Sequence, residues 1–331
     1  MGRRIAGSIL LVIALMIVVA VPVLAFTPFG NHTLRNMGIT VSSSPSPIVF
    51  TPTPVPSPSP VLTVQNQPPN IQAKYAYLLD ADTGNVLADT DGEVPAQMAS
   101  TTKIMTALIA IQTGNLKQIV TVQQNAYNEV VLHDGSSAGL VVGDQLSLKD
   151  LLYGLMLPSG DDAAIAIADA LGGPTAFVQR MNLFAYRLHL FQTHYLNPDG
   201  LNYNPYGLPI ADHHTTAANL AHLAAYAMSV PLFAQIVSTQ QYVVPPTEFH
   251  HGYKWVNINA LLTNYTGATG IKTGFTPQAG YCLVFSATRD GHHLIGVVLD
   301  SPTEESRFTD ATTLLNWGFA LPLMPPALPA G

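Results

Sequence analysis

The chain has 331 residues, of which 48% are apolar and only 10% are charged, and its formal net charge is −7. The charge is uneven: the first 70 residues carry three arginines and no acid, or +3, and the rest carries 10 basic and 20 acidic side chains, or −10. An acidic folded part excludes a typical nucleic-acid binder, because phosphate contacts need clustered lysine and arginine. A single cysteine excludes an intrachain disulfide framework and a cysteine-based zinc site.

The N-terminus contains a segment of membrane-spanning length. Arg3 and Arg4 precede an uncharged apolar run of 22 residues, 5–26, which would span roughly 30 Å as a helix. The two arginines predict that residues 1–4 stay in the cytoplasm and that the rest of the chain is exported. A signal peptide cleaved after the small residue Ala25 is the alternative. The run exceeds the usual signal-peptide core in length, which favours a retained anchor.

Residues 27–70 form the next predicted segment, a linker rich in proline, serine and threonine. From 41 to 70, nine of thirty residues are proline. Such a sequence cannot bury a core and prefers an extended polyproline-like form, at ~3.1 Å per residue. The linker is either a simple disordered spacer or a stalk that holds a folded domain away from the membrane.

Residues 71–320 are predicted to fold, followed by a tail at 321–331. Strands are predicted near both ends of the folded part, at 75–80, 86–89, 281–288 and 294–299. Helices are predicted between and after them, at 101–112, within 147–188, from 215 onward, and at 304–317. This order predicts an α+β fold in which the terminal strands share one antiparallel sheet, with helices on its faces and a helical lobe inserted.

Ser100 and Lys103 are the first candidates for chemistry. Their i, i+3 spacing at the start of the predicted helix puts both side chains on one helical face. A serine at a helix N-terminus exposes its hydroxyl beside backbone N–H groups that can stabilise an oxyanion, and a neutral lysine can deprotonate it. A capping serine and a solvated lysine are the commoner interpretation of this spacing alone.

Two further short motifs follow in order along the chain. Residues 159–161, Ser-Gly-Asp, precede an apolar helix, where Ser159 also suits an N-cap and Asp161 the positive helix end. Residues 272–274, Lys-Thr-Gly, begin a sheet region, where lysine and threonine can bind a carboxylate and glycine lets a ligand approach the strand backbone. Taken singly, each motif has an ordinary structural explanation.

The three motifs together resemble the signature set of penicillin-binding proteins and serine β-lactamases. The stretches MASTTKIMTAL, LPSGDDAAIAIAD, LNPDGL, NINALL, GIKTGFTPQAGYCLVFSATRDG and LLNWGF resemble the low-molecular-weight D-alanyl-D-alanine carboxypeptidases of serine peptidase family S11. The resemblance covers about residues 74–320. It implies the serine β-lactamase/transpeptidase-like fold, no cofactor, and removal of the terminal D-alanine from peptidoglycan stem peptides. β-Lactams would acylate the same serine as covalent inhibitors.

The resemblance also implies roles for the catalytic residues. Ser100 would be the nucleophile that forms the acyl-enzyme, and Lys103 the base that accepts its proton. Ser159 would relay a proton to the leaving amine. Lys272 would supply positive charge that helps Lys103 act as a base and attracts the substrate carboxylate.

Substrate binding is expected to involve the third motif and the last helix. Thr273 would hydrogen-bond the substrate carboxylate, and Gly274 would let it approach the strand. Arg307 stands where the family often has an arginine that can bind the same carboxylate. The oxyanion hole would be the backbone N–H groups of Ser100 and Phe275.

Asp161 departs from the family pattern, in which the second motif usually ends in asparagine. An asparagine amide can donate a hydrogen bond to a substrate carbonyl, whereas an ionised aspartate cannot. An anion beside Lys103 also favours the protonated lysine, which cannot act as a base. Either Lys272 offsets this charge, Asp161 is protonated, or activity is low. If Asp161 limits acylation, an Asp161→Asn variant is expected to react faster.

Several other features receive structural interpretations. Adjacent histidines at 213–214, 250–251 and 292–293 would point to opposite faces of a strand, so no metal site is predicted. Cys282 is expected to be a buried small apolar group. Many family members continue into a β-rich domain with a terminal amphipathic membrane helix, whereas 11 residues follow Ala320 here. The N-terminal anchor is expected to replace that attachment.

The sequence therefore predicts a membrane-tethered serine D,D-carboxypeptidase on the outer side of a bacterial cell membrane, or a secreted one if residues 5–26 are cleaved. A β-lactamase of the same fold often uses a glutamate after the second motif to activate water, and residues 162–188 contain none. A catalytically weak or inactive penicillin-binding or wall-binding module is the alternative from another class. A stalked adhesin would rest on the linker alone.

Overall fold

The structure is a computed structural model that describes residues 60–202 and 212–325. The chain divides into two units, Met1–Ser57 and Pro58–Gly331, and all described residues belong to the second unit. The predicted anchor at 5–26, and most of the predicted linker, lie outside the described residues. Among the described helices none is singly long and apolar enough to span a membrane; only the pair Ala217–Met228 and Pro231–Ser238, bent by 106°, passes by length and composition.

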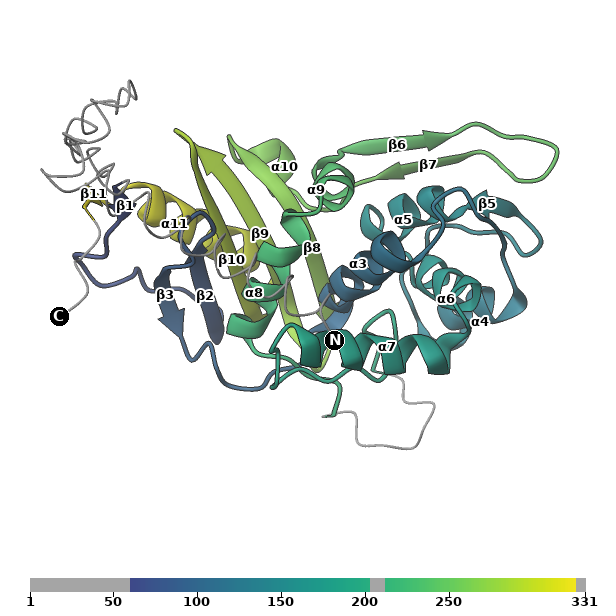
Figure 1. Cartoon of the computed structure of the whole chain (residues 1–331), viewed down its shortest axis with the longest axis horizontal. Coiled ribbons are helices and arrows are strands. Elements are labelled where there is room, and N and C mark those ends of the chain that lie inside the picture. Colours follow the sequence, from purple (N-terminus) through teal and green to yellow (C-terminus); the bar gives the residue numbers. More distant parts are fainter. Residues whose placement is uncertain (1–59, 203–211, 326–331) are drawn as a thin grey trace, which may run out of the picture. The chain divides into compact units, whose positions relative to one another are not determined.

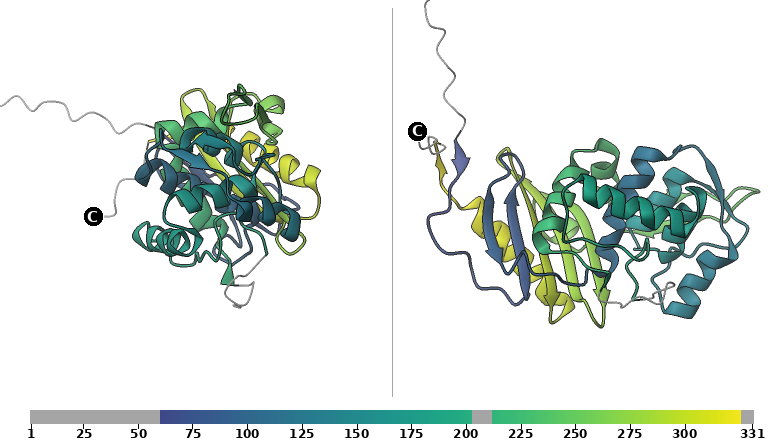
Figure 2. Two further views of the ribbon diagram at one scale, coloured as in Figure 1. Left: turned by 90° about the vertical axis from the view of Figure 1, so that its right-hand side faces the viewer. Right: turned by 60° about the horizontal axis from the view of Figure 1, so that its bottom comes forward.

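A five-stranded antiparallel sheet forms the centre of the described unit, in the order β3-β2-β10-β9-β8 (Figure 1). Its strands come from both ends of the folded part: β2 (Tyr75–Asp80), β3 (Val86–Thr90), β8 (Ala268–Thr276), β9 (Gly280–Arg289) and β10 (His292–Ser301). The right-hand view of Figure 2 shows these early and late strands side by side. The predicted α+β fold is confirmed, and the Lys-Thr-Gly motif lies inside the edge strand β8.

The sheet is buried on both faces because its strands alternate apolar side chains between two cores. On β2, Tyr77 and Leu79 join one hydrophobic cluster, and Leu78 joins the other. Helix α8 (Ala217–Met228) packs with the first cluster, against β2 and β10. Helix α11 (Glu304–Phe319) packs with the second, against β9 and β10.

The chain between β3 and β8 supplies the inserted helical lobe. Its helices are α3 (Lys103–Thr113), α4 (Gln124–His133), α5 (Leu148–Met156), α6 (Asp161–Ala170), α7 (Pro174–Arg187), α9 (Pro231–Ser238) and α10 (Leu261–Asn264). Two small hairpin-like sheets complete it: β4 (Ile119–Thr121) with β5 (Gln145–Ser147), and β6 (Gln241–Val244) with β7 (Tyr253–Val256).

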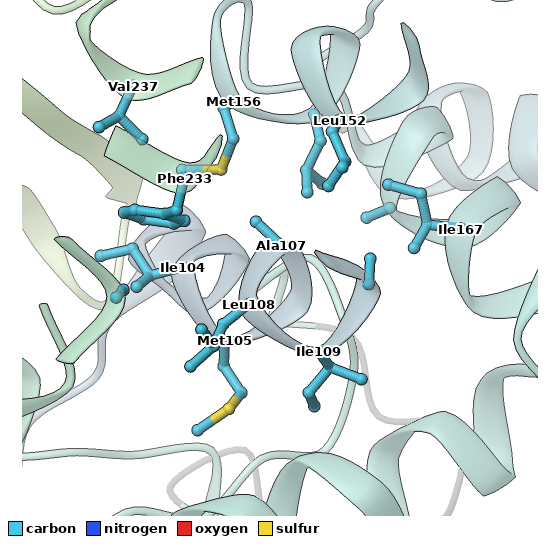
Figure 3. Close-up of a cluster of buried hydrophobic side chains, with 14 of the residues drawn as sticks. Ile104, Met105, Ala107, Leu108, Ile109, Leu152, Met156, Ile167, Phe233 and Val237 are labelled. Atoms are coloured by element: carbon cyan, nitrogen blue, oxygen red, sulfur yellow. The ribbon is translucent and has the colours of Figure 1, made fainter. Parts of the chain in front are cut away.

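Helix α3 lies at the centre of this lobe. Its first eight residues, Lys103–Ala110, are all buried, so this helix is enclosed on every side rather than on one face. Figure 3 shows its side chains surrounded by those of α5, α6 and α9, including Leu152, Ile167 and Phe233. A helix enclosed in this way holds its first residue, Lys103, and the turn before it, which carries Ser100, in a fixed place.

Two predicted boundaries differ from the structure. β1 (Val61–Leu62) pairs with β11 (Leu323–Met324), and Leu62 is buried in the core beneath α11. Folded structure therefore begins before residue 71 and extends beyond residue 320, because the end of the predicted linker and the start of the predicted tail form a short sheet together. The helix predicted from residue 101 begins instead with a 3-10 turn, η1 (Ala99–Thr102), followed by α3.

Candidate active site

Ser100 and Lys103 meet at the junction of η1 and α3. Lys103 Nζ donates a hydrogen bond to Ser100 Oγ at 2.8 Å. Ser100 retains 7% of its surface, whereas Lys103 has none exposed. The preceding residue, Ala99, has a positive φ of 46°, a conformation that costs energy for a residue with a Cβ. The turn thus points Ser100 away from the core while its lysine partner remains inside.

Lys103 makes two further hydrogen bonds inside the protein. Its Nζ lies 2.5 Å from Asp161 Oδ1 and 2.9 Å from the backbone oxygen of Asp199. Together with Ser100 Oγ, these oxygens give an ammonium group one acceptor for each of its three protons. Asp161 is the one carboxyl among these three described acceptors, so a proton between Lys103 and Asp161 is placed where it can move to either group.

Asp161 is the first residue of α6 and is fully buried. Its Oδ2 accepts the backbone N–H of Ser136 at 2.6 Å. Burial raises the pKa of Asp161 to about 7, with the charge of Lys103 acting in the opposite direction. Asp161 can consequently hold a proton near neutral pH, which is one of the three possibilities left open by the sequence.

Ser159 lies on the other side of the site, two residues before α6. It is buried, and its backbone is left-handed at φ 70°. It lines the same cavity as Ser100. A strained backbone held in place by the fold is common at functional sites, and here it presents a hydroxyl towards the cavity.

Lys272 on β8 is buried and donates to the backbone oxygen of Thr273 at 3.0 Å. Burial, followed by the nearby charge of Lys103, lowers the pKa of Lys272 well below its ordinary value. The sequence predicted Lys272 as the cation and Lys103 as the neutral base. Lys103 has the carboxyl of Asp161 within hydrogen-bond distance, whereas Lys272 donates to a backbone oxygen, and the division of roles between the two lysines stays a prediction.

Arg307 reaches the site from α11 with both terminal nitrogens of its guanidinium hydrogen-bonded. Its Nη1 donates to the backbone oxygen of Gly274 at 3.2 Å, and its Nη2 to Glu304 Oε1 at 2.7 Å. The guanidinium is buried, and burial lowers its pKa from the ordinary value. Glu304 is largely exposed, so a substrate carboxylate would have to displace it to take both donors.

Gly274 lies directly against Ser100, the predicted nucleophile. A Cβ at Gly274 would stand 3.1 Å from the backbone nitrogen of Ser100, so a side chain there would push β8 and η1 apart by a few tenths of an ångström. The N–H of a first helical residue has no intrahelical partner, and an edge strand such as β8 has N–H groups that no neighbouring strand receives. These features suit the predicted oxyanion hole of Ser100 and Phe275.

One cavity of about 630 Å³ gathers most of the predicted site. Six predicted residues line it: Ser100, Ser159, Thr273, Gly274, Phe275 and Arg307. The three remaining predicted residues, Lys103, Asp161 and Lys272, lie buried behind this lining. The cavity therefore presents hydroxyls and an arginine to a ligand, and keeps the ionisable groups that would move protons away from water.

Comparison with known proteins identifies the family. The family model described as D-alanyl-D-alanine carboxypeptidase, Peptidase S11, matches residues 62–303. The chain belongs to this family. It is 38% identical over 266 residues to a D-alanyl-D-alanine carboxypeptidase of Streptomyces sp. strain K15, covering 76% of this chain and 89% of that protein. It is 31% identical over 254 residues to DacF of Bacillus subtilis, covering 75% of this chain and 62% of that protein.

Solved structures of the carboxypeptidase family share the fold. The crystal structure of the Streptomyces K15 DD-transpeptidase is 38% identical, has a TM-score of 0.72, and covers 77% of this chain and 100% of that one. The predicted family and the serine β-lactamase/transpeptidase-like fold are both confirmed.

Sequence reasoning missed a histidine that supports the turn carrying Ser100 in this carboxypeptidase-family site. Buried His213 accepts the N–H of Leu196 at Nδ1, 3.0 Å away, so its other nitrogen, Nε2, carries the proton. Nε2 lies 2.9 Å from Thr102 Oγ1, which donates in turn to the oxygen of Ala99 at 2.8 Å. These hydrogen bonds fix the carbonyl group of Ala99, the residue with positive φ before Ser100. They join segments that are far apart in the sequence, so no local sequence pattern indicates them.

Two acidic residues were also missed, Glu129 on α4 and Asp199 in the LNPDGL stretch. Both are buried, and the backbone oxygen of Asp199 binds Lys103. The LNPDGL stretch contributed to the family resemblance, but its spacing alone gave no reason to place it against Lys103.

Proposed function

We propose that this protein is a serine D-Ala-D-Ala carboxypeptidase that removes the terminal D-alanine of peptidoglycan stem peptides through an acyl-enzyme on Ser100. The observation that carries the proposal is the position of Ser100 Oγ, which faces the cavity while hydrogen-bonded at 2.8 Å to the buried amine of Lys103. The family match and the name of the K15 relative support this substrate class.

Acylation would start with a proton shift inside the buried pair. Lys103 passes a proton to Asp161 Oδ1, 2.5 Å away, which the raised pKa of that carboxyl permits. The freed lone pair on Lys103 then accepts the proton of Ser100 as Oγ attacks the peptide carbonyl carbon. The backbone N–H groups of Ser100 and Phe275 stabilise the oxyanion. The C–N bond breaks, and the proton reaches the leaving D-alanine amine through Ser159.

Deacylation would use the same groups in the reverse order. A water molecule gives a proton to Lys103, attacks the ester carbon, and the proton returns to Ser100 as the shortened peptide leaves. The substrate carboxylate would be held by Thr273 and by Arg307. Arg307 already donates to the carboxylate of Glu304. Substrate binding would therefore replace this carboxylate with that of the substrate.

We infer that residues 5–26 anchor the protein in the bacterial cell membrane, with the catalytic unit on the extracytoplasmic side. The apolar length of this segment and the arginines before it support the proposal. Fractionation of cells that express the full chain tests it. Recovery in the membrane fraction after alkaline carbonate washing is expected, whereas a soluble product lacking residues 1–25 would show cleavage and a secreted enzyme.

Release of D-alanine tests the activity. The full-length protein in detergent is incubated with a diacyl-Lys-D-Ala-D-Ala peptide beside its Ser100→Ala variant. We expect release from the wild type and none from the variant, at equal folded content by circular dichroism. Release that persists in Ser100→Ala would overturn the proposed mechanism. Absence of release from both, with penicillin binding retained, would instead favour a non-catalytic binding module.

A further inference from the structure

Two carboxyl groups lie beside the lysine pair without a place in the mechanism above. Glu129, on α4, retains 9% of its surface, and Asp199, in the loop after α7, retains none. Buried carboxylates are rare unless a hydrogen bond or a countercharge compensates for the loss of water. The contacts of these two groups therefore need an explanation.

The Asp199 segment is held rigidly against the nucleophile helix. Asn197 accepts the N–H of Gly200 at 2.8 Å and donates to the oxygen of Leu201 at 2.7 Å. Thr106 on α3 donates to the oxygen of Pro198 at 2.5 Å. The oxygen of the next residue, Asp199, is then aimed at Lys103 Nζ, 2.9 Å away.

Only one of the two side-chain oxygens of Asp199 accepts a hydrogen bond from the described residues. Its Oδ1 accepts the N–H of Leu201 at 2.8 Å. Its Oδ2 is buried, and no N–H or O–H group of residues 60–202 and 212–325 donates to it. The Glu129 carboxyl is the side chain that acts on the Asp199 carboxyl as both a charge and a hydrogen-bond partner. Two carboxylates cannot hydrogen-bond to each other, so a proton held between Glu129 and Asp199 would supply the donor that the buried Asp199 carboxyl lacks.

The surroundings strengthen the case for a retained proton. Asp161 on α6 adds a third negative group near Glu129, and the opposing charge is Lys103 on α3. His133, on the same helix as Glu129, places Nδ1 3.3 Å from Glu129 Oε1 and lines the active-site cavity. Burial is the largest influence on both carboxyls and raises the pKa of Glu129 and of Asp199 to about 7.

We propose that Glu129 and Asp199 share one proton near neutral pH and act as positioning residues that set the charge around the Lys103–Asp161 pair, and thereby the pH at which Ser100 becomes reactive. The inference rests on the proposed function and adds to it two buried residues, Glu129 and Asp199, that influence Lys103. Neither residue lines the cavity that holds Ser100, so both would act through Lys103 and Asp161.

The direction of the effect follows from the charges. When Lys103 and Asp161 are both protonated, Lys103 cannot accept the proton of Ser100, so this pair must first lose one proton. As the pH rises, loss of the shared proton leaves two negative charges on Glu129 and Asp199. The added charge strengthens proton binding by the neighbouring Lys103–Asp161 pair. The reactive form is therefore reached at a higher pH than it would be beside a single fixed charge.

Glu129→Gln and Asp199→Asn test this directly. Each variant keeps one negative charge and one hydrogen bond between the two side chains but cannot lose a shared proton. The rate constant for acylation of the full-length protein by benzylpenicillin is measured from pH 5.5 to 9.5. We expect the rising limb of the pH profile to move to lower pH by roughly one unit in both variants, with plateau rates within about threefold of wild type.

Asp169→Asn is the matched control. Asp169 is at the other end of α6 from Asp161, and burial also raises its pKa, but its carboxylate bonds to Asn125 far from Lys103. Its profile should coincide with that of the wild type. Profiles of Glu129→Gln and Asp199→Asn that also coincide with wild type would overturn the proposal, as would opposite shifts in the two variants. An unreactive wild type would count against the proposed function itself, which keeps the two failures distinct.

Discussion

The charge state of Lys103 decides how this site works. Its ammonium group has three acceptors, among them Asp161 at 2.5 Å, whereas Lys272 donates only to a backbone oxygen of its own strand among the described contacts. The residue expected to act as the base is thus the one that an acidic side chain holds. In the proposed mechanism a proton passes from Lys103 to the buried Asp161 carboxyl, which lies within hydrogen-bond distance.

An Asp161→Asn variant is expected to acylate faster than wild type near pH 7. The amide removes the anion that holds Lys103 in its protonated form, and a buried lysine without a countercharge favours the neutral form. It also supplies an N–H donor for a substrate carbonyl. An increase of about tenfold corresponds to roughly 1.4 kcal/mol of the barrier. Stopped-flow acylation by benzylpenicillin measures the rate, and an equal or slower reaction would contradict the idea that Asp161 limits acylation.

The motif residues and their partners differ in how far sequence could identify them. Ser100, Lys103 and residues 159–161 and 272–274 were recognisable because each motif is local and the three occur in a known order. Asp199 and His213 were not, because their contacts with Lys103 and Thr102 cross 96 and 111 positions along the chain, and Glu129 lies in a helix that the sequence did not indicate. Only the folded backbone brings such groups together.

At the level of elements, the turn that carries Ser100 is clamped between β8 and the loop containing Gly200. Gly200 has φ 95°, and a Cβ there would lie 1.9 Å from the oxygen of Ala99. Gly274 approaches the same turn from the strand side. The strained Ala99 conformation is therefore enforced by two glycines that permit close backbone packing, and by the His213–Thr102 hydrogen bonds behind it.

Gly200→Ala should consequently lower the free energy of unfolding by more than the left-handed backbone at this position explains. Gly143 is the matched control, since it has the same φ of 95° but a Cβ added there would meet no atom within 4 Å. Both variants incur about 1 kcal/mol for a left-handed alanine, and Gly200→Ala should lose a further ~3 kcal/mol from the clash. Denaturant unfolding measures both. Equal losses in the two variants would show that the loop yields easily and does not clamp the turn.

The elements themselves were unequally predictable. Strands β2, β3, β9 and β10 and helix α11 lie within two residues of their predicted bounds because their apolar alternation or helical spacing is strong. Strand β8 was recognised only as the start of a sheet region, since its glycines weaken the strand pattern. Helix α4 and the β6–β7 hairpin were missed, because α4 buries only Ala126 and Glu129, and the hairpin is short and half-exposed.

For the whole molecule, the buried acids make stability depend on pH. Burial raises the folded-state pKa of Glu129, Asp161 and Asp199 to about 7, above the unfolded values near 4. Between these values the folded state binds more protons than the unfolded state. The stability contributed by these groups is therefore complete below pH about 4 and is lost as the pH rises through about 7.

The buried imidazole of His213 has the opposite effect. Burial lowers its pKa from 6.5 to about 3, so its contribution to stability is complete above pH 6.5 and is lost as the pH falls.

A comparison of the wild type with Glu129→Gln isolates the contribution of the acidic residues to stability. We expect the wild-type Tm to exceed that of the variant by a few degrees more at pH 5 than at pH 8. A Tm difference that does not change with pH would contradict the assignment of a raised pKa to Glu129.

The whole mechanism depends on Ser100 Oγ, activated by Lys103, forming the covalent intermediate. To test this, the full-length protein is treated with benzylpenicillin and digested, and the adduct is located by mass spectrometry. We predict one adduct, on the peptide that contains Ser100, and no adduct in a Ser100→Ala variant with an unchanged Tm. An adduct on another residue, or one that persists in Ser100→Ala, would show that Ser100 is not the nucleophile.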